Sequence, residues 1–321
     1  MQNQNKIPMK KITSILCILC IAVLFSACKK EEGVYNPPKK ISKITYRTNA
    51  TDAYGDEIGP TTITQQWIWN KNHTLKEIVE NDGNNQKTYQ FVYDKKKRIE
   101  RVNIDGRCCY EYTYDGNYLK GLKRFSTSGK ELESYTFIHS DGKISEIRSE
   151  MKLEDDYPNE KMAASMFSPL QFVLPEEVTG LMKKEQSEHE KKNGTKGGSV
   201  LTILKLFWAK ENVIQIESDV TETWNVNSPN VYEETYHLTI GLCYDTGHNP
   251  FCGFLLGDVF DMGLSNETAF NKNNIMQIDM LSDRPGQPYI QYRYQYRYEQ
   301  KYPIVKWEMA HNLYTEEFEY K

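Results

Sequence analysis

The chain has 321 residues, of which 26% are charged and 39% hydrophobic, and its mean hydropathy is −0.69. This polarity excludes an integral membrane protein built of helices. The near balance of 40 basic against 44 acidic residues excludes nucleic-acid binding by bulk positive charge. The 22 tyrosines, with 12 phenylalanines and 5 tryptophans, favour β-structure, because aromatic side chains are enriched in strands.

The first residues have the pattern of an export signal. An apolar run over 12–25 follows a lysine-rich start and is too short to cross the ~30 Å hydrocarbon core of a bilayer as a helix. The small residues Ser26 and Ala27 end this run, and Cys28 follows them. A plain secretory signal needs the small residues but has no use for the cysteine.

This stretch resembles a bacterial lipobox, at which signal peptidase II cuts before a cysteine that carries lipid. Ser26, Ala27 and Cys28 match the motif, whereas Phe25 stands where the family usually has an aliphatic residue. The resemblance implies that residues 1–27 are a signal peptide and that Cys28 anchors the protein in a membrane. Several acyl chains, at ~0.8 kcal/mol per buried methylene, hold such an anchor stably. The alternative is a secretory signal with a chance cysteine.

A charged cluster over 29–32 follows Cys28 and resembles the export signal that sends Bacteroidetes lipoproteins to the outer leaflet of the outer membrane. The alternative is a solvated tether. We expect residues 28–40, with Pro37 and Pro38, to form a flexible tether. The expected localisation is the outer membrane, lipid-anchored and exposed at the cell surface. Removing 1–27 takes away three lysines and no acid, so the formal net charge falls from −4 to −7.

One pattern recurs four times between residues 60 and 150. Two aromatic residues spaced two apart precede a polar turn and then two aliphatic residues spaced three apart. The copies are Trp67 and Trp69 before Leu75 and Ile78, Phe91 and Tyr93 before Ile99 and Val102, Tyr112 and Tyr114 before Leu119 and Leu122, and Phe137 and His139 before Ile144 and Ile147.

Each copy predicts a β-hairpin, because residues two apart lie on one face of a strand and Asp, Asn and Gly close tight turns. The spacing of three on the returning strand departs from strict alternation. Either the first aliphatic residue caps the turn, or a β-bulge resets the register.

These copies resemble the YD (RHS) repeats, in which an aromatic-x-Tyr-Asp unit precedes a short turn and a Leu-x-x-Val unit. The copies that contain Tyr93-Asp94 and Tyr114-Asp115 keep the Tyr-Asp pair, and the others do not. Looser copies, such as the one around Tyr296 and Tyr298, occur in the second half of the chain.

The order of lipobox, YD-like hairpins and an Asn249-Pro250-Phe251 turn resembles a group of gut Bacteroidetes outer-membrane lipoproteins. This group is described as domains of unknown function with a porin-like β-fold. The resemblance implies a fold and a location, and it implies no activity.

The fold we expect is all-β, an antiparallel up-and-down meander of about 14–16 strands in one β-rich domain over 41–321. Such a sheet either stays open and strongly curled or closes into a barrel, because exposed edges must be hidden. Residues 155–198 break the hairpin pattern. We expect a short insertion there, either a helix that begins near Pro175 or a mobile loop.

Cys243 and Cys252 flank a short loop that also contains Asp245 and His248. Three interpretations remain open: a disulfide between the two cysteines, two free thiols, and a metal or catalytic site. We predict the Cys243–Cys252 disulfide. The sequence contains no His-Glu-x-x-His signature, nucleophile elbow, phosphate loop or triad pattern. We therefore predict no cofactor, no resident metal and no nucleic-acid partner.

The C-terminal region carries a row of tyrosines that alternates with Arg293, Gln295 and Arg297. Such a row is either a platform that stacks against sugar rings or a strand with its tyrosines inward, and we favour the second interpretation. Trp67 and Trp69, taken as an exposed pair, carry the same ambiguity. The candidate stacking residues are Tyr292, Tyr294, Tyr296, Tyr298, Trp67 and Trp69.

The function that fits these observations is an envelope lipoprotein that acts as a binding or structural module for a glycan or protein partner. The alternative is a secreted, glycosidase-like hydrolase on the same scaffold, because carboxylates are plentiful enough to form a pair in three dimensions.

Overall fold

The computed structural model divides the chain into two compact units, Met1–Glu31 and Glu32–Lys321. Of the first unit only Glu31 is described, so Cys28 and the predicted signal peptide lie outside the described residues. No helix in the described part of the chain is long and apolar enough to cross a membrane. The structure describes residues 31–51, 57–126, 128–153, 170, 172–174, 198–224, 231–255, 269–283, 289–309 and 314–321.

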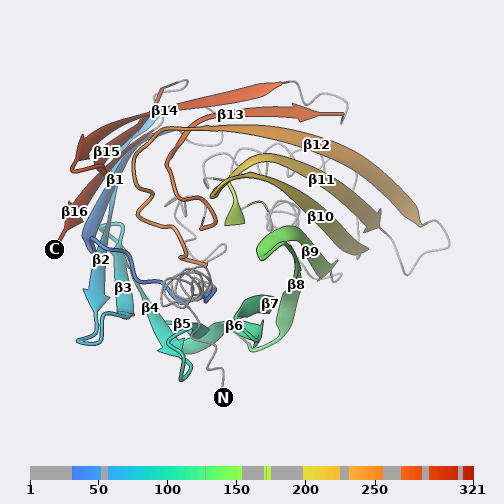
Figure 1. The fold of residues 1–321 in the computed structure, drawn as a ribbon, viewed down its shortest axis with the longest axis horizontal. Coiled ribbons are helices and arrows are strands. Elements are labelled where there is room, and N and C mark those ends of the chain that lie inside the picture. Colours follow the sequence, from blue (N-terminus) through green and yellow to red (C-terminus); the bar gives the residue numbers. More distant parts are fainter. Residues whose placement is uncertain are drawn as a thin grey trace, which may run out of the picture. The chain divides into compact units, whose positions relative to one another are not determined.

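Sixteen antiparallel strands form a closed barrel, in which each strand pairs with the next and β1 pairs with β16 (Figure 1). The expected all-β meander is therefore confirmed, and of the two alternatives the sheet takes the closed form. The strands are β1 Ile41–Thr51, β2 Glu57–Trp69, β3 Leu75–Asn81, β4 Gln86–Tyr93, β5 Ile99–Ile104, β6 Arg107–Asp115, β7 Tyr118–Phe125, β8 Glu131–Ser140, β9 Lys143–Leu153, β10 Gly198–Ala209, β11 Asn212–Trp224, β12 Tyr232–Tyr244, β13 Ile275–Ser282, β14 Ile290–Glu299, β15 Tyr302–Glu308 and β16 Tyr314–Tyr320.

The predicted insertion lies between β9 and β10. Most of it falls outside the described residues, so the choice between helix and loop stays a prediction. Its described residues, Leu170 and 172–174, are buried, with Phe172 1% exposed.

The two faces of the wall differ in polarity. Along β6, Tyr110 and Tyr112 are buried, whereas Glu111 and Thr113 between them are exposed. The exposed face carries cross-strand ion pairs such as Lys43–Glu319, at 3.0 Å. The apolar core therefore lies inside the barrel, and the outer face is polar. A barrel that faces lipid has the opposite arrangement.

A β-bulge explains the aliphatic spacing of three. In the first repeated hairpin Trp67 pairs with Ile78, and Trp69 pairs with Leu75, so that β3 has one extra residue between them. The same shift occurs, at the same end of the barrel, at an aromatic residue of six further strand pairs. The shifts precede Trp69, Tyr93, Tyr114, His139, Trp208, Tyr244 and Tyr298.

Aromatic residues at this end of the even-numbered strands, five of them at the bulges, also join one hairpin to the hairpin before it. The Tyr93 hydroxyl donates to the carbonyl oxygen of Leu75 at 2.7 Å, beyond the last backbone pair of β3 and β4. Seven of the eight even-numbered strands make this bond. The bonds run from Trp69 to Ile41, Tyr93 to Leu75, Tyr114 to Ile99, Trp208 to Ile144, Tyr244 to Val213, Tyr296 to Ile275 and Tyr320 to Pro303.

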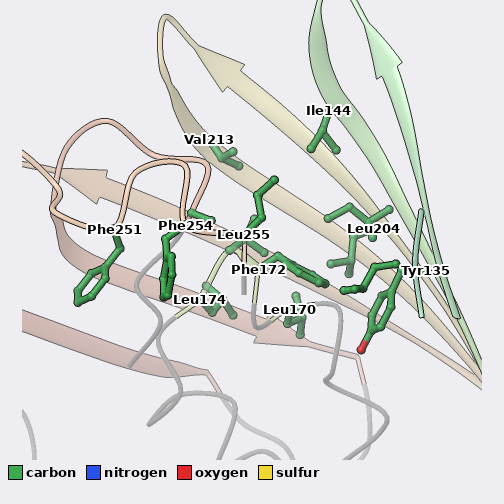
Figure 2. Packing of buried hydrophobic residues seen from close by; sticks show 14 of the residues in the cluster. Tyr135, Ile144, Leu170, Phe172, Leu174, Leu204, Val213, Phe251, Phe254 and Leu255 are labelled. Atoms are coloured by element: carbon green, nitrogen blue, oxygen red, sulfur yellow. The ribbon is translucent and has the colours of Figure 1, made fainter. Parts of the chain in front are cut away.

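The end of the barrel that holds these aromatic residues is filled by the N-terminal segment, the described parts of the β12–β13 loop, Leu170 and residues 172–174, and we call it the plugged end. Tyr35 is 1% exposed, packs 4.6 Å from Phe254 between ring centroids, and donates to the Pro250 carbonyl oxygen at 2.8 Å. Phe172 makes an edge contact with Tyr135 of β8, at 5.3 Å. Figure 2 shows Phe172 pointing toward Tyr135.

Residues 32–40, the second part of the expected tether, contact the wall of the barrel. The Glu32 carboxylate accepts a bond from the Leu119 backbone N–H at 2.7 Å and lies 3.0 Å from His139 Nε2. The next residue, Gly33, accepts from the backbone of Ile99 at 3.0 Å. The segment is thus fixed to the wall by backbone bonds, which composition alone does not reveal.

Gly33 should be intolerant of any side chain. Its φ is +79°, and a Cβ atom there collides with the Tyr114 ring, whose ε carbon would lie 2.8 Å away. We expect Gly33→Ala to lower the free energy of unfolding by more than ~1 kcal/mol, as measured by urea denaturation followed through tryptophan fluorescence.

Gly129→Ala is the matched control, because Gly129 has a φ of +82° but no atom within 4 Å of the position that a Cβ would take. This variant carries the backbone strain without the collision. Equal losses of stability in the two variants would contradict the docked position of the N-terminal segment.

Candidate functional site

A groove of about 810 Å³ opens in the outer wall of the barrel where β13 and β14 separate. These strands pair only between Gln277–Met280 and Ile290–Arg293, and beyond this ladder the Tyr296 hydroxyl spans the gap to Ile275. The groove is lined by Cys243, Met276, Gln277, Gln291, Arg293, Tyr294, Gln295 and Met309.

Asp279 organises the polar groups beside this groove. Its carboxylate accepts hydrogen bonds from Gln277 Nε2 at 2.7 Å, from Gln291 Nε2 at 2.6 Å and from the Tyr289 hydroxyl. Partial burial acts to raise the pKa of Asp279, but these three bonds and the nearby charge of Arg293 hold it below its ordinary value. The carboxylate is therefore ionised at neutral pH and fixes the orientation of two amides and a phenol.

Solvent-exposed apolar side chains lie at the same part of the wall. Tyr289 is 55% exposed, Leu281 60% and Met309 43%. The hydrogen bond to Asp279 raises the pKa of the Tyr289 hydroxyl, so the phenol stays neutral and keeps its proton to donate. An exposed aromatic ring beside oriented amides, a carboxylate and a guanidinium group is a combination suited to a ligand with both apolar and hydroxylated faces.

The predicted tyrosine row faces the interior. Tyr292 and Tyr294 are each 1% exposed, whereas Arg293 between them is exposed on the outer face. Tyr296 and Tyr298 are half-buried and stack on each other at 5.8 Å. The inward interpretation therefore describes this strand, and Tyr292 and Tyr294 do not form an open stacking platform.

Trp67 and Trp69 are not the exposed pair that the sequence suggested. Trp67 is 2% exposed, and its Nε1 donates to Gln65 Oε1 at 3.2 Å. Trp69 is half-buried under Lys40, whose Nζ lies 4.7 Å from the ring centroid. The alternation rule explains both positions, because the core occupies the barrel interior.

The predicted bridge between Cys243 and Cys252 is not formed, since all four cysteines in the described part of the chain have free thiols. Cys243 is exposed at the groove on β12, whereas Cys252 lies half-buried in the following loop. Among the residues that the structure describes, no group of three or more His, Cys, Asp or Glu side chains is placed to hold a metal ion.

Further polar groups lie inside the barrel, away from the groove. Glu80 accepts hydrogen bonds from Gln65 Nε2 at 3.0 Å and from Tyr89 at 3.2 Å. Ser149 donates to Glu133 at 2.6 Å. These carboxylates are 1% exposed, and their bonds offset the cost of burying charge. We assign them to the interior packing of the barrel.

The sequence analysis missed Gln277 and Gln291, which line the groove, and Asp279 and Tyr289, which lie beside it. One signal was present, because Gln291 and Arg293 occupy the alternate positions of the tyrosine strand. The partners on β13 have no comparable pattern. They become recognisable only once the pairing of β13 with β14 is known.

No protein-family model matches the sequence, and no curated protein matches it significantly. Two similar solved structures are porin-like proteins. The one from Bacteroides uniformis ATCC 8492 has a TM-score of 0.43 and 10% identity, covering 88% of this chain and 99% of that chain. The one from Bacteroides vulgatus ATCC 8482 has a TM-score of 0.46 and 9% identity, with the same coverage. The expected likeness to porin-like Bacteroidetes proteins is confirmed to that extent, and lipoprotein status and a relation to YD repeats stay predictions.

The thiols should differ in reactivity. In the native protein we expect iodoacetamide to alkylate Cys243 first, because it is exposed, and Cys109 last, because it is buried. Burial also raises the pKa of the Cys108 thiol, which slows its reaction. Mass spectrometry of peptides from a time course measures the order. An unreduced peptide pair that joins Cys243 to Cys252 would contradict the free-thiol structure.

Proposed function

We propose that the protein is a lipid-anchored envelope protein that binds a polyhydroxylated ligand, of the glycan class, at the groove between β13 and β14. The observation that carries this proposal is the network in which Asp279 orients Gln277, Gln291 and Tyr289 beside Arg293. The groove volume of about 810 Å³ is within the range of small-molecule sites.

The chemistry of the network fits hydroxyl groups. Gln291 offers its carbonyl oxygen, because its amide nitrogen already donates to Asp279 and Tyr289. Arg293 offers a fork of N–H donors, so adjacent hydroxyls find both an acceptor and donors. Tyr289 presents more than half of its surface to solvent and supplies an apolar face for a sugar ring. Because Asp279 already holds the amides in place, little side-chain freedom is lost on binding.

The groove supports binding more strongly than hydrolysis. A glycosidase needs two carboxyl groups that flank the scissile bond, one of them protonated as the general acid. The residues that line the groove include no carboxylate, and Asp279 nearby has a lowered pKa, which is unsuited to a general acid. The glutamates described inside the barrel, such as Glu80 and Glu133, are 1% exposed.

The anchor is supported by the sequence around Cys28 and by the polarity of the wall. Exposed charged residues such as Lys43 and Arg47 pair with acids of β16 on the outer face, so the wall is suited to water. A lipid at Cys28 supplies the membrane attachment that such a wall does not. Display at the cell surface follows from the resemblance of residues 29–32 to an export signal.

Glycan binding should depend on the groove residues. On a glycan array and in titrations with each array hit, Arg293→Ala and Gln291→Ala should weaken binding by about tenfold or more, because each removes a polar group that lines the groove. Arg297→Ala is the matched control, since Arg297 is exposed on the same strand but does not line the groove. Equal losses in all three variants, or no bound glycan at all, would contradict the proposed ligand site.

Lipidation should require Cys28. Cells grown with an alkyne fatty acid should label the wild-type protein, and Cys28→Ser should remove the label because the thiol that carries the lipid is gone. The readout is in-gel fluorescence after coupling to an azide dye. Equal labelling of the two proteins would contradict the anchor without affecting the groove.

A further inference from the structure

The first described residues of the barrel unit are fixed to its plugged end. The Glu32 backbone N–H donates to the Asn117 carbonyl oxygen at 3.0 Å, and the Glu32 side chain binds at Leu119 and His139. Cys28 precedes Glu32 by four positions, and even a fully extended chain over these four steps spans only about 14 Å. A lipid on Cys28 therefore cannot lie far from the plugged end, whatever path the chain takes.

In the part of the chain that the structure describes, the two ends of the barrel differ in charge. At the plugged end, the described connecting residues from Glu32 onward, together with Lys321, include eleven Lys or Arg and five Asp or Glu. At the opposite end, the described connections include one basic and three acidic residues. The chain as a whole has a formal net charge of −4, so the excess of positive charge at the plugged end is local.

The lysines at the plugged end are spread around its rim. They are exposed and come from five different connections, so that the positive charge forms a ring rather than one spot. We call this set the lysine collar, and it comprises Lys71, Lys95, Lys97, Lys210, Lys272 and Lys301.

The geometry points to the plugged end as the surface that rests on the membrane, with the lysine collar against anionic lipid headgroups. This inference rests on the proposed anchor at Cys28. Anionic headgroups attract basic residues that lie within a Debye length, roughly 8–10 Å. The short connection to Cys28 starts from the end of the barrel that carries the collar, so this is the end that can approach the headgroups to within that distance. The lipid supplies the attachment, and the collar selects which end of the barrel faces the bilayer.

The opposite end is then held away from the bilayer. Strands of up to 13 residues, tilted as in closed barrels, separate the two ends by about 30 Å. This separation is large enough for a probe at one end to be distinguished from a probe at the other.

The test uses the lipidated full-length protein reconstituted into vesicles of phosphatidylcholine and phosphatidylglycerol that contain a headgroup-attached quencher. Each protein carries Cys243→Ser, which removes the exposed native thiol, and one fluorophore on either Asp115→Cys or Asn84→Cys. Asp115 is exposed at the plugged end and Asn84 is exposed at the opposite end. We expect quenching at position 115 to exceed that at position 84 several-fold.

Two charge variants test the collar itself. The triple change Lys71→Gln, Lys95→Gln and Lys97→Gln should reduce the difference in quenching between the two positions. A matched change that also removes three positive charges, Arg107→Gln, Lys123→Gln and Lys130→Gln, should leave it unchanged. These three residues are exposed and lie away from the plugged end.

The outcomes separate the orientation from the anchor. Equal quenching at both positions, or stronger quenching at position 84, overturns the orientation while fatty-acid labelling of Cys28 still stands. If the Lys71, Lys95 and Lys97 variant shows the same difference in quenching between positions 115 and 84 as the wild type, the role of the collar is overturned. Loss of Cys28-dependent labelling overturns the anchor, and the orientation falls with it.

Discussion

The barrel depends on the hydrogen bonds through which one hairpin's aromatic side chain reaches the backbone of the preceding hairpin. Backbone pairing between neighbouring hairpins stops short of the plugged end, and residues such as Tyr93 and Tyr114 span the remaining gap. Each such bond contributes about 0.5–1.5 kcal/mol net, and seven of them form a substantial share of the ~5–15 kcal/mol that stabilises a typical domain. The bulges beside them turn the aromatic rings toward the seams.

The boundary between β7 and β8 is the one without such an aromatic bond among the described strands, and there the N-terminal segment bonds to the wall instead. At this position His139 replaces the usual phenol or indole, and Glu32 of the N-terminal segment bonds to both His139 and Leu119. From there the segment leads to Tyr35, which packs against Phe254 of the β12–β13 loop. The N-terminal segment therefore connects the β7–β8 part of the wall to the side chains that fill the interior.

Local patterns predicted the wall but not the contacts between distant segments. Alternation on β14 correctly placed Tyr292 inward and Arg293 outward, and the aliphatic spacing of three correctly suggested a bulge. The burial of Tyr35 depends on Pro250, which is 215 residues away, and no local pattern reports such a contact. The groove likewise arises where two strands separate, which is a property of the closed sheet.

The hairpin, rather than the single strand, is the unit from which this wall is built. Because the seams are chemically alike, a duplicated or deleted hairpin would meet its neighbours through the same bonds. Such a wall gains or loses strands two at a time, so an even strand number is inherited from the unit itself. The interior limits changes in strand number, because the barrel radius grows with the number of strands. Tyr35, Phe172 and Phe254 fill the cross-section of a barrel of sixteen strands.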